Sequence, residues 1–160
     1  AEGVYQCGTR MKLLADLDGD GHDEEVEFVY SHGGFTLSVT RFDKSFCLGL
    51  PNWPGEEDES EQKNIHIAIK DVTNDGLPEV LLAAHDGMID LRVAVYGFNS
   101  SDARKSRVLD PAHFSLLQVL TGQWTARVLE GGSIILPYGS AGLAWTCKWT
   151  GERFDCTDQP

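Results

Sequence analysis

The sequence predicts an all-β protein, mainly antiparallel, that folds as a single domain over residues 1–160. Two observations lead to this fold class. Apolar and polar residues alternate with a period of two along several short segments, as they do in strands that bury one face. A unit of strand, acidic loop, strand, turn and strand also occurs twice. We expect three short sheet-like units, at about residues 9–50, 63–98 and 123–157.

The first unit is built around an acidic loop at residues 16–24. Residues 11–15 lead into this loop as a strand, and residues 25–30 leave it with Val26 and Phe28 on one face. A turn follows at Gly33-Gly34, and residues 35–40 then alternate apolar and polar side chains. Because a short turn joins the two strands, we expect residues 25–30 and 35–40 to pair in an antiparallel manner.

The second unit repeats this order around the loop at residues 71–79. Ile65, Ile67 and Ile69 alternate with other residues before the loop, and residues 79–84 form a continuous apolar run after it. A continuous run is typical of a strand buried on both faces, so we expect a central strand there. Asp86-Gly87 then forms a turn, and residues 89–95 form the next strand.

The third unit lacks an acidic loop. Residues 98–109 form a polar linker that carries the basic cluster of Arg104, Lys105 and Arg107. Asp110-Pro111 has the form of a helix N-cap followed by proline, and Gly122 could end that helix, so a short helix at 111–121 is expected, with a strand at 114–119 as the alternative. The expected strands of the third unit are 124–129, 132–136, 143–149 and 152–156. A closed seven-bladed propeller is excluded by the chain length.

The two acidic loops have the chemistry of a site for a hard cation. In each loop, oxygen side chains stand at positions one, three and five, and a glycine at position six permits the sharp turn that brings them to one centre. The set contains oxygen donors only, which favours Ca²⁺ over zinc or copper and leaves Mg²⁺ open. The predicted ligands are Asp16, Asp18, Asp20, the His22 carbonyl and Glu24 in the first loop, and Asp71, Thr73, Asp75, the Leu77 carbonyl and Glu79 in the second.

The loops differ from EF-hands. An EF-hand loop closes with a glutamate at position twelve, where the first loop has Glu27 but the second has Leu82. What they share is an acid at position nine, Glu24 or Glu79, that leads into a strand. This pattern resembles the calcium loops of FG-GAP/VCBS repeats, over about residues 11–30 and 65–84, without a Phe-Gly/Gly-Ala-Pro signature. The resemblance implies two bound Ca²⁺ ions and a binding role.

The net charge of −12 is concentrated in two places. Residues 16–27 contain seven acids, and residues 56–61, within a predicted solvated loop at 51–64, contain five more. Such an acidic chain disfavours nucleic acid and anionic membranes as partners and favours a basic protein, although the acidity could also serve solubility and metal capture alone. No apolar run approaches 18 residues, so no membrane insertion is expected.

The four cysteines suggest two disulfides and a secreted or periplasmic location. Cys147 and Cys156 flank a predicted hairpin that turns at Gly151-Glu152, and the register places them directly opposite each other. Cys7 and Cys47 would then pair with each other. The beginning Ala1-Glu2-Gly3 has the form of a chain cleaved after a signal peptide. The alternative is four reduced thiols in a cytosolic protein.

Motifs for catalysis are missing from the sequence. It contains no P-loop, no G-x-G-x-x-G and no H-E-x-x-H, and Tyr138-Gly139-Ser140-Ala141-Gly142 lacks the first glycine of a nucleophile elbow. This segment is either an ordinary hairpin turn or an exposed binding tip, and in the second case it is similar to the loops of periplasmic lysozyme inhibitors. We therefore expect a non-enzymatic, extracytoplasmic protein-binding module, favoured as an inhibitor or immunity partner of a secreted hydrolase. The alternatives are an adhesion or glycan-binding module and, more remotely, a metal- or Ser140-dependent hydrolase.

Overall fold

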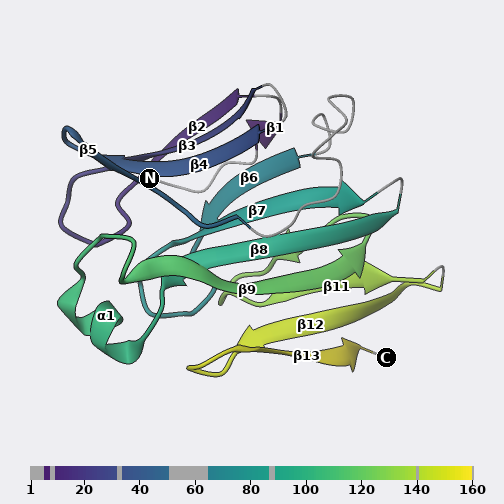
Figure 1. Ribbon diagram of the computed structural model, residues 1–160. Helices are drawn as coiled ribbons and strands as arrows, with labels where there is room; N and C mark the ends of the chain where they lie inside the picture. Colours follow the sequence, from purple (N-terminus) through teal and green to yellow (C-terminus); the bar gives the residue numbers. More distant parts are fainter. Residues whose placement is uncertain are drawn as a thin grey trace.

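The computed structural model describes residues 6–7, 10–31, 34–50, 65–86, 89–139 and 141–159 (Figure 1). These residues form one short helix and thirteen strands. In chain order the elements are β1 (Gln6–Cys7), β2 (Arg10–Ala15), β3 (Glu24–Ser31), β4 (Gly34–Arg41), β5 (Lys44–Cys47), β6 (Ile65–Lys70), β7 (Glu79–Asp86), β8 (Asp90–Phe98), α1 (Ser101–Ser106), β9 (Phe114–Gln123), β10 (Arg127–Val128), β11 (Ile134–Tyr138), β12 (Leu143–Trp149) and β13 (Phe154–Gln159).

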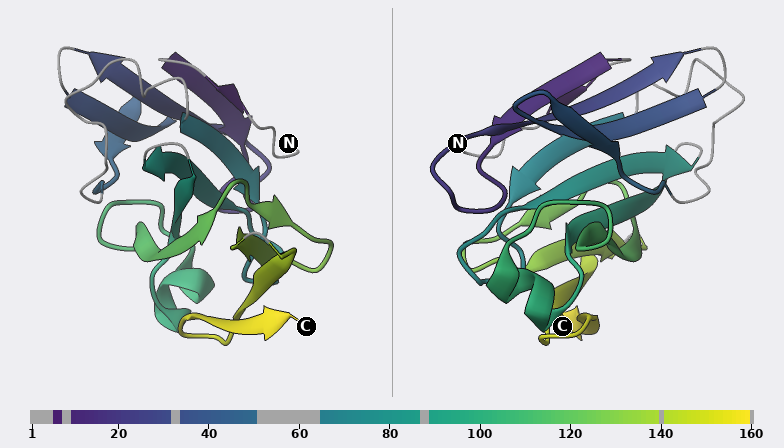
Figure 2. Two further views of the ribbon diagram at one scale, coloured as in Figure 1. Left: turned by 90° about the vertical axis from the view of Figure 1, so that its right-hand side faces the viewer. Right: turned by 60° about the vertical axis from the view of Figure 1, so that its left-hand side comes forward.

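The strands form three antiparallel sheets, which confirms the predicted fold class. The sheet of β2-β3-β4-β5 lies on one side of a five-stranded sheet with the order β1-β6-β7-β8-β9, and the sheet of β10-β11-β12-β13 lies on the other (Figures 1 and 2). Within the described residues the sheets do not close into a barrel or a propeller. The predicted loop at 51–64 lies outside the described residues.

The five-stranded sheet buries both of its faces. In β7, Val80 and Leu82 pack into the core shared with β2–β5, whereas Leu81 and Ala83 pack into the core shared with β10–β13. Strand β8 divides its side chains in the same way. The continuous apolar run after the second acidic loop is therefore explained by two buried faces, and β7 is the central strand that the sequence predicts.

The predicted pairing in the first unit is also confirmed. Strands β3 and β4 are antiparallel, with Val26 opposite Val39 and Phe28 opposite Leu37. All four side chains are fully buried against the middle sheet. Because side chains alternate between faces, this register places the apolar set of both strands on the same side.

The prediction of a helix at 111–121 is wrong, and the alternative prediction of a strand is confirmed. Asp110 does cap a turn, since its Oδ1 accepts hydrogen bonds from the N–H groups of Ala112 and His113, at 3.0 Å each. The chain then continues as β9, which pairs with β8 and buries Phe114 in one core and Leu120 in the other. Burial on both faces of a sheet outweighs the local helix signal.

The helix lies instead in the segment predicted to be a polar linker. The side chain of Ser100 accepts a hydrogen bond from the Ala103 N–H at the start of α1, and Arg107 ends the helix in the left-handed conformation, with φ 55°. Ala103 is the buried residue of this helix. One capping serine and one anchoring alanine are thus sufficient for a helix of only six residues.

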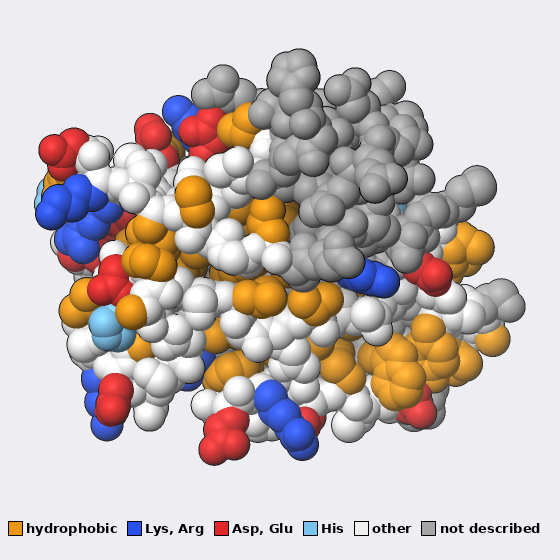
Figure 3. All heavy atoms as spheres, in the orientation of Figure 1, with side chains coloured by type: hydrophobic (Ala, Val, Ile, Leu, Met, Phe, Trp, Pro, Cys, Tyr) orange, Lys and Arg blue, Asp and Glu red, His pale blue; other side chains and the backbone are white. Residues whose placement is uncertain are grey.

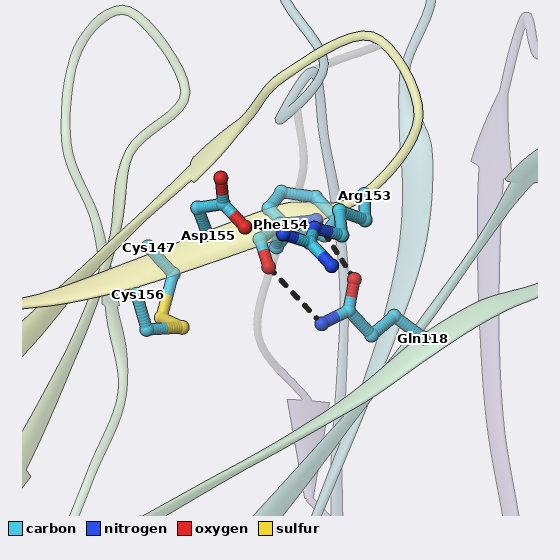
Figure 4. Close-up of a disulfide and its surroundings, with 6 residues drawn as sticks. All are labelled: Gln118, Cys147, Arg153, Phe154, Asp155 and Cys156. Carbon is cyan, nitrogen blue, oxygen red and sulfur yellow. Dashed lines mark hydrogen bonds and ion pairs between the residues drawn. A yellow bond between two sulfur atoms is a disulfide. The ribbon is translucent and has the colours of Figure 1, made fainter.

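The predicted C-terminal hairpin and its disulfide are confirmed. Strands β12 and β13 pair with Cys147 opposite Cys156 and Trp149 opposite Phe154, and the two sulfurs are bonded. Figure 4 shows how this hairpin is held to the middle sheet: Gln118 of β9 accepts from the Phe154 N–H at 2.8 Å and donates to the Phe154 carbonyl at 3.2 Å. The side-chain amide of Gln118 therefore joins β9 to an outer sheet through two hydrogen bonds.

The second predicted disulfide, between Cys7 and Cys47, is not confirmed. Cys47 is a free, exposed cysteine on β5, at the edge of its four-stranded sheet. Cys7 belongs to β1, at the edge of the middle sheet, and its side chain lies outside the described residues. Pairing by elimination carries no geometric information about where the two cysteines lie.

Candidate metal centres

The two acidic loops lie next to each other, at the left-hand end of the sheets in Figure 1. The first connects β2 to β3, and the second connects β6 to β7. Leu77 of the second loop packs against the backbone of the first, where a Cβ added to Gly19 would lie 3.0 Å from Leu77 Cδ2. The two loops that repeat in the sequence are therefore neighbours in space.

The first loop gathers four carboxylates. Asp16, Asp18, Asp20 and Glu24 each offer an oxygen within 4.8 Å of the others, so this cluster could hold a metal ion. Asp16 also organises the turn, because its two oxygens accept hydrogen bonds from the N–H groups of Gly19, Asp20 and Gly21 at 2.8 to 3.1 Å. Gly21, at position six, has the predicted left-handed backbone with φ +89°.

The second loop has the same construction with one carboxylate fewer. Asp71, Asp75 and Glu79 offer oxygens within 4.8 Å of one another. Asp71 accepts from the N–H groups of Asn74 and Gly76, at 2.9 Å each, and Gly76 has φ +86°. The side chains that the sequence predicted as carboxylate ligands are thus brought together in both loops. The carbonyl ligands, His22 and Leu77, stay predictions.

Each loop covers a buried glutamate at the first position of the following strand. Glu24 is fully buried, and one of its oxygens accepts from the Leu17 N–H at 2.8 Å while Oε2 has no hydrogen-bond partner among the described residues. Glu79 is 3% exposed and accepts from the N–H groups of Val72 and Thr73. Carboxylates buried among other carboxylates are unstable in their charged form unless a cation joins them.

The raised pKa values of Glu24 and Glu79 reflect this unfavourable burial of charge. Burial, together with the neighbouring carboxylates of Asp18, Asp20 and Asp16, raises the pKa of Glu24 to about 7. Burial, together with repulsion from Asp75 and Asp71, raises the pKa of Glu79 to about 8. A divalent cation between the carboxylates would remove both causes, because it offsets their repulsion and replaces the lost water.

Thr73 supplies independent support for a cation in the second loop. Its side chain is 9% exposed, and its hydroxyl oxygen makes no hydrogen bond of normal geometry to any described residue, although it lies near the Glu79 carboxylate. A buried hydroxyl without a hydrogen bond is costly. Coordination of a hard cation through this oxygen, at loop position three, would satisfy it. The oxygen-only donor set therefore fits Ca²⁺, and it also fits Mg²⁺.

The sequence did not reveal the arginine that contacts the first loop. Arg41, at the end of β4, binds Asp18 Oδ2 through Nη1 at 2.6 Å and Asp20 Oδ2 through Nη2. Burial raises the pKa of Asp18, whereas a hydrogen bond from the His22 N–H lowers that of Asp20. Positions three and five of this loop thus already have a cationic partner. No local pattern predicts a contact between residues 23 positions apart.

The second loop has a more distant arginine. Arg104 of α1 places Nε 3.6 Å from Asp75 Oδ2, and its guanidinium lies over the Trp149 ring, 4.8 Å from the centroid. Arg107, at the end of the same helix, lies against Gly19 of the first loop. The basic cluster that the sequence placed in a linker therefore stands beside both acidic loops.

The predicted binding tip joins β11 to β12 at the opposite end of the sheets (Figure 1). Its backbone is anchored to the middle sheet, because the Gly139 N–H donates to Gln123 Oε1 at 2.6 Å and the Gly139 carbonyl accepts from Trp124 Nε1 at 3.4 Å. Ala141 is exposed, Tyr138 is half-buried, and Ser140 lies outside the described residues. The role of Ser140 as a partner contact or as a nucleophile is therefore not tested.

No family model, no curated protein and no solved structure matches the chain. The resemblance to FG-GAP/VCBS repeats accordingly stays a prediction from the two loops. Among the described residues, no helix is long and apolar enough to cross a membrane.

The raised pKa values of Glu24 and Glu79 predict an unusual pH dependence. A carboxyl whose folded pKa lies above its unfolded value stabilises the fold at low pH, and this contribution is lost as the pH rises through the folded value. With divalent cations chelated, we expect the melting temperature to fall between about pH 5 and pH 8. Saturating Ca²⁺ should remove this fall. Thermal melts followed by circular dichroism test both, and a chelated chain whose stability rises over this range would contradict the assignment.

The contact of Arg41 with Asp18 and Asp20 predicts that the first loop binds Ca²⁺ with lower affinity than it would without this arginine. The substitution Arg41→Gln removes the guanidinium that competes for Asp18 and Asp20, so Ca²⁺ affinity at the first loop should rise, by roughly tenfold for a charge-assisted pair worth about 1.5 kcal/mol. Calorimetric titration measures this. Lys44→Gln is the matched control, because Lys44 pairs with Arg41 in register and is exposed. Unchanged or weaker affinity in Arg41→Gln would refute the competition.

Proposed function

We propose that the chain is a non-enzymatic, extracytoplasmic binding protein whose fold is completed by two divalent cations, with Ca²⁺ favoured. The observation that carries this proposal is the pair of glutamates, Glu24 and Glu79, buried beneath clusters of other acids. Ions at these places would tie β2 to β3 and β6 to β7. The role of the metal in this proposal is structural, because the ligands belong to loops that connect neighbouring strands.

The proposed location is supported by the chemistry of the sites and by the disulfide. A Ca²⁺ site built from exposed acidic loops is typical of proteins that meet millimolar calcium. The Cys147–Cys156 disulfide fits an oxidising compartment. Together these features support a secreted or periplasmic protein.

The binding surface that we propose is the anchored hairpin between β11 and β12. Trp124 and Leu143 are 47% and 39% exposed beside it, and both line a pocket of about 450 Å³. Figure 3 shows hydrophobic side chains gathered over this end of the β10–β13 sheet. Exposed aromatic and aliphatic side chains on a rigid support are typical anchors of protein interfaces.

The net charge of −12 suggests the class of partner. An acidic surface speeds association with a basic protein and repels an acidic one. We therefore favour an inhibitor or immunity partner of a basic secreted or periplasmic hydrolase. The rigid hairpin would enter the cleft of the enzyme, and the metal-bound loops would stabilise the sheets that carry it.

If the metals stabilise the fold, the effect of Glu79→Gln on the melting temperature should differ between chelated and calcium-bound protein. Without divalent ions this variant should melt at or above the temperature of the unmodified chain, because burying Glu79 costs either a buried charge or the uptake of a proton, and a neutral amide costs neither. With Ca²⁺ it should lose the stabilisation contributed by the second loop, which is about 2.7 kcal/mol at a hundredfold excess over Kd. Calorimetric melts with and without EDTA measure both effects.

The exposed variant Glu130→Gln serves as the control and should respond to Ca²⁺ like the unmodified chain. If the unmodified chain melts at the same temperature in EDTA and in calcium, the structural role of the metal is refuted.

The partner class predicts saturable binding to a basic hydrolase. We would screen a panel of basic secreted hydrolases, lysozymes included, by surface plasmon resonance and by residual activity. Trp124→Ala with Leu143→Ala should weaken the affinity at least tenfold, since buried aromatic anchors contribute about 2 kcal/mol or more each. Leu129→Ala, exposed on the turn after β10, is the control. Binding that survives the double substitution would exclude this surface.

A further inference from the structure

Two histidines lie side by side on neighbouring strands of the middle sheet, outside both acidic loops. His66 of β6 lies opposite Ala83 of β7, and His85 follows two residues later on β7. Directly opposite residues and alternate residues of antiparallel strands share a face, so both histidines are on one face of the sheet. Ala83 packs into the core shared with β10–β13, which identifies this face as the one toward that sheet.

The two imidazoles border a small cavity. Its volume is about 230 Å³, and both histidines are half-buried at its edge. The other residues that line it are Ala83, Leu91, Thr125 and Ala126. Three of these four side chains are apolar, so the imidazoles are the main polar groups of the cavity. They lie in a space that has room for an ion and its water.

A hydrogen bond fixes the tautomer of His85. Its Nε2 lies 2.6 Å from the carbonyl oxygen of Trp124, and because a carbonyl can only accept, Nε2 carries the proton. In the neutral ring the lone pair is then on Nδ1. A histidine that binds a metal characteristically donates its other ring N–H to a carbonyl or a carboxylate, which orients the ring. The contact with Trp124 has this form.

The surroundings of His66 favour its neutral form. Burial, and then the neighbouring imidazole of His85, lower the pKa of His66, so at neutral pH one nitrogen of this ring carries a lone pair instead of a proton. Two adjacent imidazoles resist protonation of both rings. A divalent cation between them meets two lone pairs and no opposing charge.

The separation of the rings suits a cation that binds both. Their centroids are 6.4 Å apart, with an angle of 75° between the planes. Zinc–nitrogen bonds are about 2.0–2.1 Å long, so two imidazoles that hold one ion have centroids roughly 5 to 6.5 Å apart. The observed separation is at the upper end of this range. Rotation of the side chains is therefore sufficient to bring a nitrogen of each ring to one ion.

From this arrangement we infer that His66 and His85 form a two-nitrogen site for a borderline divalent cation, Cu²⁺ or Zn²⁺. Imidazole suits these ions, whereas the oxygen-only loops suit Ca²⁺, so the chain would bind two kinds of metal at separate places. Two protein ligands leave further coordination positions to water, which the cavity can hold. The inference does not depend on the function proposed above.

The test is a calorimetric titration of the full chain with copper(II) chloride and with zinc chloride. Saturating Ca²⁺ is present, so that the acidic loops are occupied. We expect one Cu²⁺ per chain with a Kd of about 10 µM or less, and Zn²⁺ roughly tenfold more weakly bound, in the order that nitrogen ligands give for these ions. The electron paramagnetic resonance spectrum of the Cu²⁺ complex should show coupling to two imidazole nitrogens.

Variants locate the site. His66→Gln and His85→Gln should each weaken Cu²⁺ binding roughly tenfold or more and remove one nitrogen from the resonance spectrum. Glutamine at position 85 still offers an N–H to the Trp124 carbonyl, and thermal melts without metal show whether each variant is folded. His113→Gln is the matched control, because His113 does not line the cavity and pairs with Asp110. Its affinity for Cu²⁺ should stay within about twofold of the unmodified chain.

A second control concerns the thiols, since thiolates bind the same ions. Cys47 is free and exposed, and Cys7 lies opposite His66 in the pairing of β1 with β6. The titration is therefore repeated on a chain with Cys7→Ser and Cys47→Ser. One Cu²⁺ per chain, with coupling to two nitrogens, should still be found.

Four outcomes would overturn the inference. They are no Cu²⁺ binding with a Kd below about 1 mM, binding that persists when both histidines of a folded chain are glutamine, a resonance spectrum with oxygen ligands only, and binding that is lost in the serine form. A failure here leaves the calcium melts and the hydrolase experiment unaffected, because neither uses His66 or His85.

Discussion

Burial of mutually repelling carboxylates is the constraint on which the rest of this structure depends. Glu24 and Glu79 begin the strands that leave the acidic loops, and both point into the protein beneath other acids. Gly97 makes room for Glu79, because a Cβ added to Gly97 would lie 2.9 Å from Glu79 Cγ. Charges placed in this way must be neutralised by protons or by a counter-charge, which Arg41 supplies in part at the first loop and a bound cation would supply at both.

The middle sheet connects the metal loops to the surface that we propose for binding. It shares one core with the β2–β5 sheet and a second core with the β10–β13 sheet, so the metal loops and the β11–β12 hairpin belong to one packed structure. The outer sheet is held further by Gln118 and by the close approach at Gly122. The proposed recognition at one end of the strands would therefore depend on a scaffold that carries its buried charges at the other end.

Local features of this fold could be predicted from the sequence, and long-range ones could not. Alternation and turn residues were sufficient for the pairing of β3 with β4 and for the register of Cys147 with Cys156, since both partners lie within one hairpin. Asp110 does form the predicted cap, but it caps a turn rather than a helix. The residues that follow form a strand because they pair with β8. Arg41 contacts Asp18, which lies 23 positions earlier, and no periodic pattern within one segment predicts such a contact.

The contact between Leu77 and Gly19 has a consequence for how the chain would respond to its ion. A loop that closes around a cation fixes the position of Leu77, and Leu77 is part of the surface on which the other loop folds. Filling one site thus lowers the ordering cost of its neighbour, which is the condition for positive cooperativity. Such a protein would switch between loose and rigid forms over a narrow span of calcium concentration, as a threshold device rather than a graded one.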